Sequence, residues 1–481
     1  MGYGLRPPPI LRATRFVTLG GMLSLLLCLA ASSTQPPNLV FVLVDDLGWR
    51  DLGVTGSPVC RTPHLDAFAA EGMRFTQAYA AAPICSASRA AILTGKSPAR
   101  LHFEFVTKSD PGRQQIAGVP LRTPPFTLDL PLEETTIAER LAGYRTAFFG
   151  KWHVSRHHQR YLGWSPTHGP RQQGFDVAVE DFGGHPYNSE PQLPPKRGAY
   201  PGDSLTDRAI ESITTADGSQ PFFLMVSHFY VHTPVKPNAD WLVVRIRRDH
   251  PELPAAHVRY AAFVEILDHH VGRLLAAIDE TTSGRETVVV ITSDNGGDPR
   301  FTRHGSLRGH KWTLFEGGIR VPLLVRWPGV VAAGSVQEEA VIGTDLLPTF
   351  AAIAGQPLTA EPSDGVSLVP LLKDAAATLP PRPLVWHFPY YHPETNAGPE
   401  LDVVGTNDNR VPFVEPHSAV RLGDMKTLLF HRTGDVLRFG PDARDAGESQ
   451  PVALTDAERA TAREEVLRLL AERDARLPIA E

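Results

Sequence analysis

The chain has 481 residues, of which 42% are hydrophobic and 21% charged, and its formal net charge is −6. This length and composition allow more than one domain with a sizeable hydrophobic core. The slightly acidic balance and the lack of a long basic run argue against nucleic acid as a partner.

The N-terminus has the order of a secretory signal. Arginines precede an apolar stretch at 16–30, and small residues follow at 31–33. The apolar stretch is too short for a membrane-spanning helix. We therefore predict a signal peptide at 1–33, no stable membrane anchor, and an exported protein that is periplasmic or extracellular.

Three continuous apolar runs, Asn38–Val44, Phe222–Val226 and Thr287–Ile291, are typical of strands buried on both faces of a parallel sheet. Helical patterns alternate with them. A capping box at 136–139 opens one helix, and apolar residues recur at helical spacing over 256–278. This alternation predicts an α/β sheet covered by helices on both faces, with ligands beyond the carboxyl ends of the strands.

A Pro- and Ala-rich stretch at 375–383 indicates a boundary. We predict a larger domain at 34–375 and a smaller α+β domain at 384–481.

Within the smaller domain, Ala419–Leu422 and Lys426–Phe430 flank a Gly-Asp turn and predict a hairpin. A second capping box at 455–458 predicts a last helix that runs towards Leu477.

The densest chemical signal is the segment Cys85–Gly95, CSASRAAILTG. Ser86 or Ser88 is expected to cap a helix that Gly95 ends. The N-terminus of such a helix favours anionic substrates through its free N–H groups and dipole. Arg89 lies four residues after Cys85, on the same helical face, where it would hold an oxyanion or fix a metal ligand. The ordinary alternatives for Cys85 are a buried thiol or a disulfide with Cys60.

This segment resembles the signature of the type I sulfatases, Cys-x-Pro-Ser-Arg followed five residues later by Thr-Gly; Ala87 stands where that family usually has Pro. In the family the cysteine is oxidised to Cα-formylglycine. Its hydrate attacks sulfur, the alcohol leaves, and sulfate is expelled from a sulfated enzyme intermediate. The resemblance implies a sulfatase that carries formylglycine 85, made by a formylglycine-generating maturation enzyme, and that acts on a sulfated carbohydrate or an aryl sulfate.

Oxygen ligands follow two of the apolar runs. Asp45-Asp46 comes after the first and Asp294-Asn295 after the third. A lone Asp-Asn-Gly is most often a turn, but two such pairs favour one shared metal, Ca²⁺ or, as second choice, Mg²⁺. By resemblance the ligands are Asp45, Asp46, Asp294 and Asn295, with residue 85 as a fifth.

Four cationic or titratable residues also match the family in order. Lys151 and His153 lie in a Gly-Lys-Trp-His motif, His232 in a His-x-Pro motif, and Lys311 follows Gly-His. The resemblance implies that Lys151 binds sulfate oxygens and that His153 bonds the formylglycine diol. His232 and Lys311 would stabilise or protonate the leaving oxygen. Each of them alone would be an ordinary solvated or core side chain.

The match runs from Pro37 to the last helix and includes Gly317–Pro322, which we interpret as a structural turn near the site. It implies an alkaline-phosphatase-like mixed α/β sheet, with helices on both faces and a smaller C-terminal α+β domain.

Substrate residues are less well defined. His304 and Arg308 lie near Lys311 in sequence and are candidates for the mouth of the pocket. His387 belongs to an aromatic and His-rich stretch at 386–392 that would either stack on a substrate ring or form a buried contact between domains.

Two other functions fit the same residues. A formylglycine-dependent phosphodiester or phosphonate monoester hydrolase would use the same nucleophile and fold. If Cys85 stays unconverted, the chain would be a non-catalytic protein that binds sulfated glycans.

Overall fold

The computed structural model describes residues 1–2, 35–108, 112–114, 116, 118–188, 195–196, 198–281, 285–303, 305–358, 363–393, 413–441, 447–448 and 450–480. Contacts divide the chain into two units, Met1–Ser33 and Thr34–Glu481. The predicted signal peptide lies almost wholly outside the described residues. Among the described residues, no helix is both long and apolar enough to cross a membrane.

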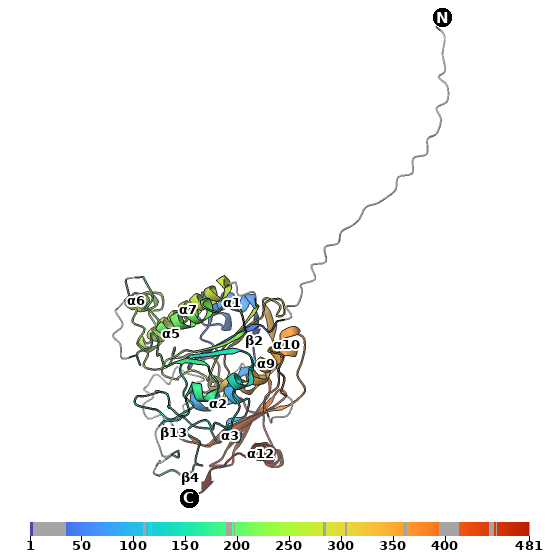
Figure 1. The fold of residues 1–481 in the computed structure, drawn as a ribbon. Coiled ribbons are helices and arrows are strands. Elements are labelled where there is room, and N and C mark those ends of the chain that lie inside the picture. Colours follow the sequence, from blue (N-terminus) through green and yellow to red (C-terminus); the bar gives the residue numbers. More distant parts are fainter. Residues whose placement is uncertain are drawn as a thin grey trace. The chain divides into compact units, whose positions relative to one another are not determined.

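The unit Thr34–Glu481 is built on an eight-stranded mixed sheet (Figure 1). Its strands, in spatial order, are β10 (Ser335–Gln337), β2 (Met73–Phe75), β9 (Leu323–Arg326), β8 (Thr287–Ser293), β1 (Asn38–Val44), β7 (Phe222–Ser227), β5 (Arg145–Gly150) and β6 (Val177–Val179). Strands β8, β1, β7, β5 and β6 are parallel, whereas β9 runs antiparallel to β8. The three apolar runs are β1, β7 and β8, so their prediction as buried parallel strands is confirmed.

Helices cover both faces of this sheet because successive side chains of a strand point to opposite sides. Val40, Val42 and Val44 pack on one face, and Leu39, Phe41 and Leu43 on the other. The first face is covered by α1 (Pro63–Glu71), α5 (Ser204–Thr214), α6 (Asp240–Asp249) and α7 (Ala255–Glu280). The second is covered by α2 (Cys85–Thr94), α3 (Pro98–Leu101), α4 (Ile137–Arg140), α9 (Leu346–Ile353) and α10 (Val369–Lys373) (Figure 1).

The C-terminal part contains a second, antiparallel sheet, with the order β12 (Pro383–Phe388), β15 (His417–Leu422), β16 (Met425–Phe430) and β17 (Val436–Phe439). The predicted hairpin is confirmed as β15 and β16, whose strands pair antiparallel. Helix α12 (Asp456–Ala471) packs on one face of this sheet through apolar side chains. The domain boundary at 375–383 remains a prediction.

Both predicted capping boxes form, at Thr136 and at Thr455. The second of the helices they open is shorter than predicted. Helix α4 ends at Arg140, and α12 ends at Ala471 instead of running towards Leu477, because the chain turns back there and the Ala475 N–H bonds the Leu470 carbonyl.

The remaining elements are short. They are η1 (Gly53–Thr55), β3 (Ala78–Tyr79), β4 (Leu121–Arg122), η2 (Pro170–Gln173), α8 (Glu316–Ile319), β11 (Val341–Ile342), η3 (Gly343–Asp345), β13 (His392–Pro393), β14 (Phe413–Val414) and β18 (Ile479–Ala480).

Candidate active site

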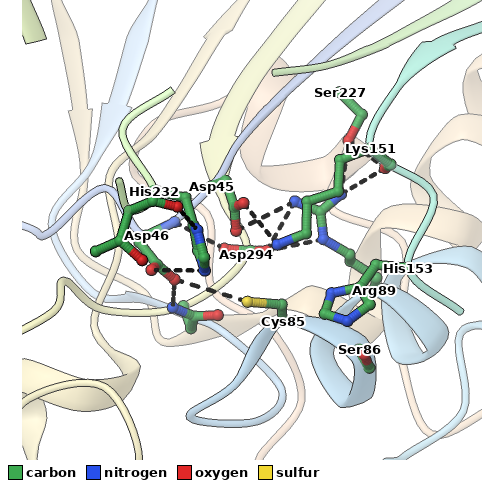
Figure 2. Close-up of polar contacts among 12 residues, drawn as sticks. Asp45, Asp46, Cys85, Ser86, Arg89, Lys151, His153, Ser227, His232 and Asp294 are labelled. Atoms are coloured by element: carbon green, nitrogen blue, oxygen red, sulfur yellow. Dashed lines mark hydrogen bonds and ion pairs between the residues drawn. The ribbon is translucent and has the colours of Figure 1, made fainter. Parts of the chain in front are cut away.

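The polar residues selected from the sequence meet at the carboxyl ends of four parallel strands. Asp45 and Asp46 follow β1, Lys151 follows β5, His232 lies in the loop after β7, and Asp294 follows β8. Since the carboxyl ends of parallel strands share one edge of the sheet, these side chains converge there. Figure 2 shows them gathered around Cys85 at the start of α2.

Helix α2 begins two residues earlier than a cap at Ser86 would place it. Its N-cap is Ile84, which provides no side-chain cap, and Cys85 is the first helical residue. Ser86 therefore lies inside the first turn, where its Oγ accepts a hydrogen bond from the Thr107 N–H at 3.1 Å. The prediction of Ser86 or Ser88 as the cap is wrong. Gly95 does end the helix, with a φ of 67° that favours glycine.

Cys85 is buried, and its Sγ lies 3.7 Å from Asp46 Oδ1. Burial raises the pKa of the Cys85 thiol, although Lys151 and Lys311 oppose the shift. Both cysteines in the described part of the chain, Cys60 and Cys85, are free. The described structure therefore excludes a disulfide between them.

Arg89 contacts two of the candidate metal ligands, and it lies on the same face of α2 as Cys85, four residues further along. Its Nε and Nη2 both lie 2.8 Å from Asp294 Oδ2, and its Nη2 lies 3.6 Å from Asp45 Oδ1. Its Nη1 donates to the Lys151 carbonyl at 2.8 Å and to Ser227 Oγ at 2.6 Å. Of the two roles considered for Arg89, these contacts favour fixing the candidate metal ligands.

The donor set fits a hard cation. One ligand atom each from Asp45, Asp46, Cys85 and Asp294 lies within 4.8 Å of all the others. Asn295 joins this group, since its Nδ2 donates to Asp46 Oδ1 at 2.7 Å. Two buried oxygens, Asp45 Oδ1 and Asn295 Oδ1, have no hydrogen-bond partner. Buried unpaired oxygens are costly unless a cation or donor satisfies them, and oxygen donors of this kind suit Ca²⁺ or Mg²⁺.

The backbone allows both neighbouring carboxylates to reach the site. On an extended strand, consecutive side chains point to opposite sides. Asp46 has a φ of 61°, a left-handed conformation that Asp tolerates better than most residues. The Asp46 N–H then donates to Asp294 Oδ1 at 3.1 Å, which links the ends of β1 and β8.

Two buried lysines approach the outer oxygens of these carboxylates. Lys151 Nζ lies 2.5 Å from Asp45 Oδ2, and Lys311 Nζ lies 2.7 Å from Asp46 Oδ2. Burial alone would lower the pKa of each lysine, but the surrounding anionic groups, first among them Asp45 for Lys151 and Asp46 for Lys311, together outweigh burial and raise the pKa. Because their pKa values are raised, both lysines are charged at neutral pH. Burial raises the pKa of Asp294 to about 6, and Arg89 partly opposes this rise.

Two histidines flank the cluster, His232 beside Asp46 and His153 on the side of Arg89 (Figure 2). His232 Nε2 lies 3.7 Å from Asp46 Oδ2, and burial lowers the pKa of His232 to about 3. The Nε2 of His153 bonds the Thr107 carbonyl at 3.2 Å, while its Nδ1 is buried without a partner. Burial, with Lys151 second, holds the pKa of His153 well below its usual value. Both rings are thus neutral and available as hydrogen-bonding groups.

The Gly317–Pro322 segment packs against Gly296, which follows the candidate metal ligands Asp294 and Asn295. Gly296 N–H bonds the Gly318 carbonyl at 3.0 Å, and a Cβ at Gly296 would lie 2.0 Å from the Gly317 carbonyl oxygen. Only glycine allows this approach of two backbones, so the segment has the structural position expected for it.

Three further residues support the site and were not selected from the sequence. Ser227 bonds Arg89, Thr107 bonds His153, and the Tyr187 hydroxyl lies 3.1 Å from His232 Nδ1. Ser227 ends a buried strand, which is a usable signal. Thr107 and Tyr187 lie in loops whose patterns give none.

Neither of the two candidate substrate residues that the structure describes joins the cluster. His304 lies outside the described residues. Arg308 stacks on the Phe315 ring at 4.2 Å and donates to the Glu448 carbonyl. His387 is buried in β12, where its ring bonds Ser418 Oγ and the Arg476 carbonyl. This packing argues against a substrate contact by His387 and agrees with the alternative of a buried contact.

Comparison with known proteins supports one family. The model of the family described as "Sulfatase" matches residues 37–356, and the model described as "N-sulphoglucosamine sulphohydrolase, C-terminal" matches residues 308–436. The chain is 36% identical over 409 residues to arylsulfatase A of Homo sapiens, covering 78% of this chain and 75% of that protein. It is 34% identical over 387 residues to N-acetylgalactosamine-6-sulfatase of Mus musculus, covering 73% and 69%.

A solved structure shares the fold. The crystal structure of Ps i-CgsB in complex with k-i-k-neocarrahexaose superposes with a TM-score of 0.69 and 24% identity, covering 92% of this chain and 93% of that one. The predicted mixed α/β architecture with a smaller C-terminal part is thereby confirmed. The chain is an enzyme that hydrolyses sulfate esters, and it belongs to the type I sulfatase family of the alkaline phosphatase superfamily.

Proposed function

We propose that this sulfatase is calcium-dependent, carries formylglycine at position 85 and cleaves sulfate monoesters of carbohydrates. The observation that carries the proposal is the buried group of Asp45, Asp46, Cys85 and Asp294, with two oxygens left unpartnered beside it. Hard oxygen donors with free lone pairs favour Ca²⁺, with Mg²⁺ as second choice.

The cation would be held by Asp45, Asp46, Asp294 and Asn295, together with residue 85. When bound, it would offset the repulsion among the carboxylates and polarise an oxygen of the sulfate group. Formylglycine 85, once hydrated, would supply the hydroxyl that attacks sulfur. The start of α2 favours this placement, because the free N–H groups of its first turn face an anionic substrate.

The remaining roles belong to side chains already in place. Lys151 and Lys311 would bind sulfate oxygens, since both are charged, buried and at the edge of the carboxylate group. His232 would hydrogen-bond the leaving oxygen, and His153 would bond the hydroxyls at position 85. Arg89 would orient Asp294 and Asp45 and is a positioning residue.

The choice of carbohydrate rests on the names of relatives. One acts, by its name, on N-acetylgalactosamine 6-sulfate, and a structure with the same fold was solved with a saccharide bound. We further propose export through the signal at 1–33, maturation by a formylglycine-generating enzyme, and a boundary near residues 375–383.

The test compares matched esters on purified protein from its native host. Turnover of p-nitrophenyl sulfate should exceed that of p-nitrophenyl phosphate and of bis-p-nitrophenyl phosphate. A preference for the phosphodiester would refute the sulfatase assignment in favour of the related phosphodiesterase. Calcium removal by a chelator should abolish activity, and calcium should restore it more fully than magnesium.

A further inference from the structure

A pocket of about 630 Å³ lies where the segment 113–125 meets the C-terminal strand β18. Strands β4 and β18 pair antiparallel, with Arg122 opposite Ile479, and so hold the two segments together. The pocket is lined by three arginines, Arg113, Arg122 and Arg476. None of the residues proposed to act on sulfate lines it.

The three arginines give the pocket an excess of positive charge. All are exposed, and among the described residues none of their side chains forms an ion pair or a hydrogen bond. Two acidic groups lie near Arg476. Burial raises the pKa of Glu104 well above its usual value, although Arg476 opposes this, and the exposed Asp474 offsets part of the charge, so that the arginines remain in excess. The pocket is therefore a concentrated positive region on a chain whose net charge is −6.

Direct contacts connect this pocket to the active site. Lys311 Nζ lies 5.5 Å from the centre of the Trp312 ring, which stacks on His392 with centroids 3.7 Å apart. The preceding residue, Tyr391, bonds Gln114 in both directions, at 2.6 and 2.9 Å. Gln114 lines the pocket next to Arg113.

Tyr391 also bonds the part of the chain that contains Arg122. The Tyr391 hydroxyl accepts from the Leu121 N–H at 3.2 Å, beside Arg122. The pocket and the site are thus two ends of one contact path that begins at a sulfate-binding lysine.

We propose that this pocket is a subsite for a second oxyanionic group, a sulfate or carboxylate, on a polyanionic saccharide whose scissile sulfate lies at residue 85. The inference rests on the proposed function and specifies its substrate class. Guanidinium groups suit it because they bind planar or tetrahedral oxyanions through paired N–H donors.

The test measures kcat/KM against chain length. Substrates would be p-nitrophenyl sulfate and size-fractionated di- to octasaccharides of heparin, chondroitin sulfate and carrageenan. Wild-type enzyme should hydrolyse at least one series, with kcat/KM rising by roughly tenfold once the saccharide spans both places, since exposed ion pairs each contribute a factor of about two to five. Carrageenan lacks carboxylates, so it separates sulfate from carboxylate recognition.

The variants are Arg122→Gln and the triple change to Gln at Arg113, Arg122 and Arg476. The triple variant should lose the length-dependent gain through KM and keep wild-type turnover of p-nitrophenyl sulfate. Arg122→Lys retains the charge but loses the paired N–H donors, so it should retain more of the gain than Arg122→Gln and less than the wild type; β4 keeps its backbone pairing in both variants. Arg259→Gln, at an exposed position on α7, is the matched control and should behave as wild type.

Two results would overturn the subsite. One is equal kcat/KM at all lengths, or no hydrolysis of any series, while p-nitrophenyl sulfate is turned over. The other is an unchanged length dependence in the triple variant. If the wild-type enzyme instead hydrolysed no sulfate ester, p-nitrophenyl sulfate included, the proposed function would be refuted, so the two failures are distinguishable.

Discussion

Replacing Asp294 with alanine should remove both the metal and the activity. Asp294 is fully buried and receives both Nε and Nη2 of Arg89 at 2.8 Å, so the variant leaves a buried guanidinium without its main counterion. Breaking a buried pair costs about 3–5 kcal/mol. Arg89 keeps the Lys151 carbonyl and Ser227 hydroxyl as partners, so we expect a loss near the lower end, about 3 kcal/mol.

The assay separates this structural loss from metal loss. Urea unfolding would be followed in a chelator and in excess calcium. A ligand at 100 times its Kd stabilises the folded state by about 2.7 kcal/mol, so wild type should gain this amount with calcium and Asp294→Ala almost none. Turnover of p-nitrophenyl sulfate should fall by at least about 10³-fold, because the cation contributes several kcal/mol to the transition state.

Two further variants sharpen the result. Asp364→Ala breaks a partly buried Arg–Asp pair with Arg100 at another place, at 2.8 and 2.9 Å, and should lose stability, by less than Asp294→Ala, while keeping the calcium response and the activity. The double variant Arg89→Leu/Asp294→Ala should regain part of the stability and none of the activity, because it removes the unpaired charge and still lacks the ligand. Full activity of Asp294→Ala, or a calcium response equal to wild type, would show that the metal site is misassigned.

Three other outcomes can be checked. In protein from the native host, the peptide that contains Cys85 should be lighter than its unmodified mass by about 18 Da, the difference between –CH₂SH and –CHO; an intact thiol there would refute the formylglycine mechanism. Lys426→Met should lower the free energy of unfolding in urea by about 3–5 kcal/mol, because it removes the ammonium that lies 3.0 Å from each of the buried carboxylates of Glu316 and Glu448. Lys373→Met, at an exposed position, is the control, and an equal loss of stability in both variants would contradict the reasoning. Burial raises the pKa of Asp51 to about 7, partly opposed by the Tyr260 hydroxyl, so the folded state holds this proton more tightly than the unfolded state. The stabilising contribution of this proton is complete below about pH 4 and is lost as the pH rises through 7, so that the free energy of unfolding falls by up to about 4 kcal/mol. Asp51→Asn should remove this decline when the free energy of unfolding is measured between pH 4 and 8. Identical pH profiles of the variant and the wild type would contradict the prediction.

Local pattern was sufficient for the buried strands and for the ligand pairs that follow them. The run Asn38–Val44 is β1 with the same bounds, since a fully apolar heptapeptide has to be covered on both faces. The capping boxes at Thr136 and Thr455 also formed as predicted, because their hydrogen bonds join residues three apart. The capping boxes did not predict where the helices end, because a helix ends where a further turn would have no partner to pack against or where a tight turn changes the direction of the chain.

The prediction for His387 shows where composition misleads. An aromatic and His-rich stretch fits a substrate platform and a buried layer equally well. The choice depends on what packs against it, and Ser418 lies 31 residues away from His387 and the Arg476 carbonyl 89 residues away. Tyr187 is the opposite case, since nothing local marks its contact with His232.

Residue types and their order along the chain were enough to indicate the chemistry, because the candidate ligand and catalytic residues follow buried strands and the parallel arrangement brings the ends of these strands together. The arrangement of the charges depended on the folded chain. The tertiary structure turned Asp46 into the left-handed region so that two adjacent carboxylates face one site, set Arg89 on Asp294, and gathered three arginines from distant segments into one pocket. These outcomes depend on distances between groups far apart in the chain, and such distances are set by packing, which no local pattern encodes.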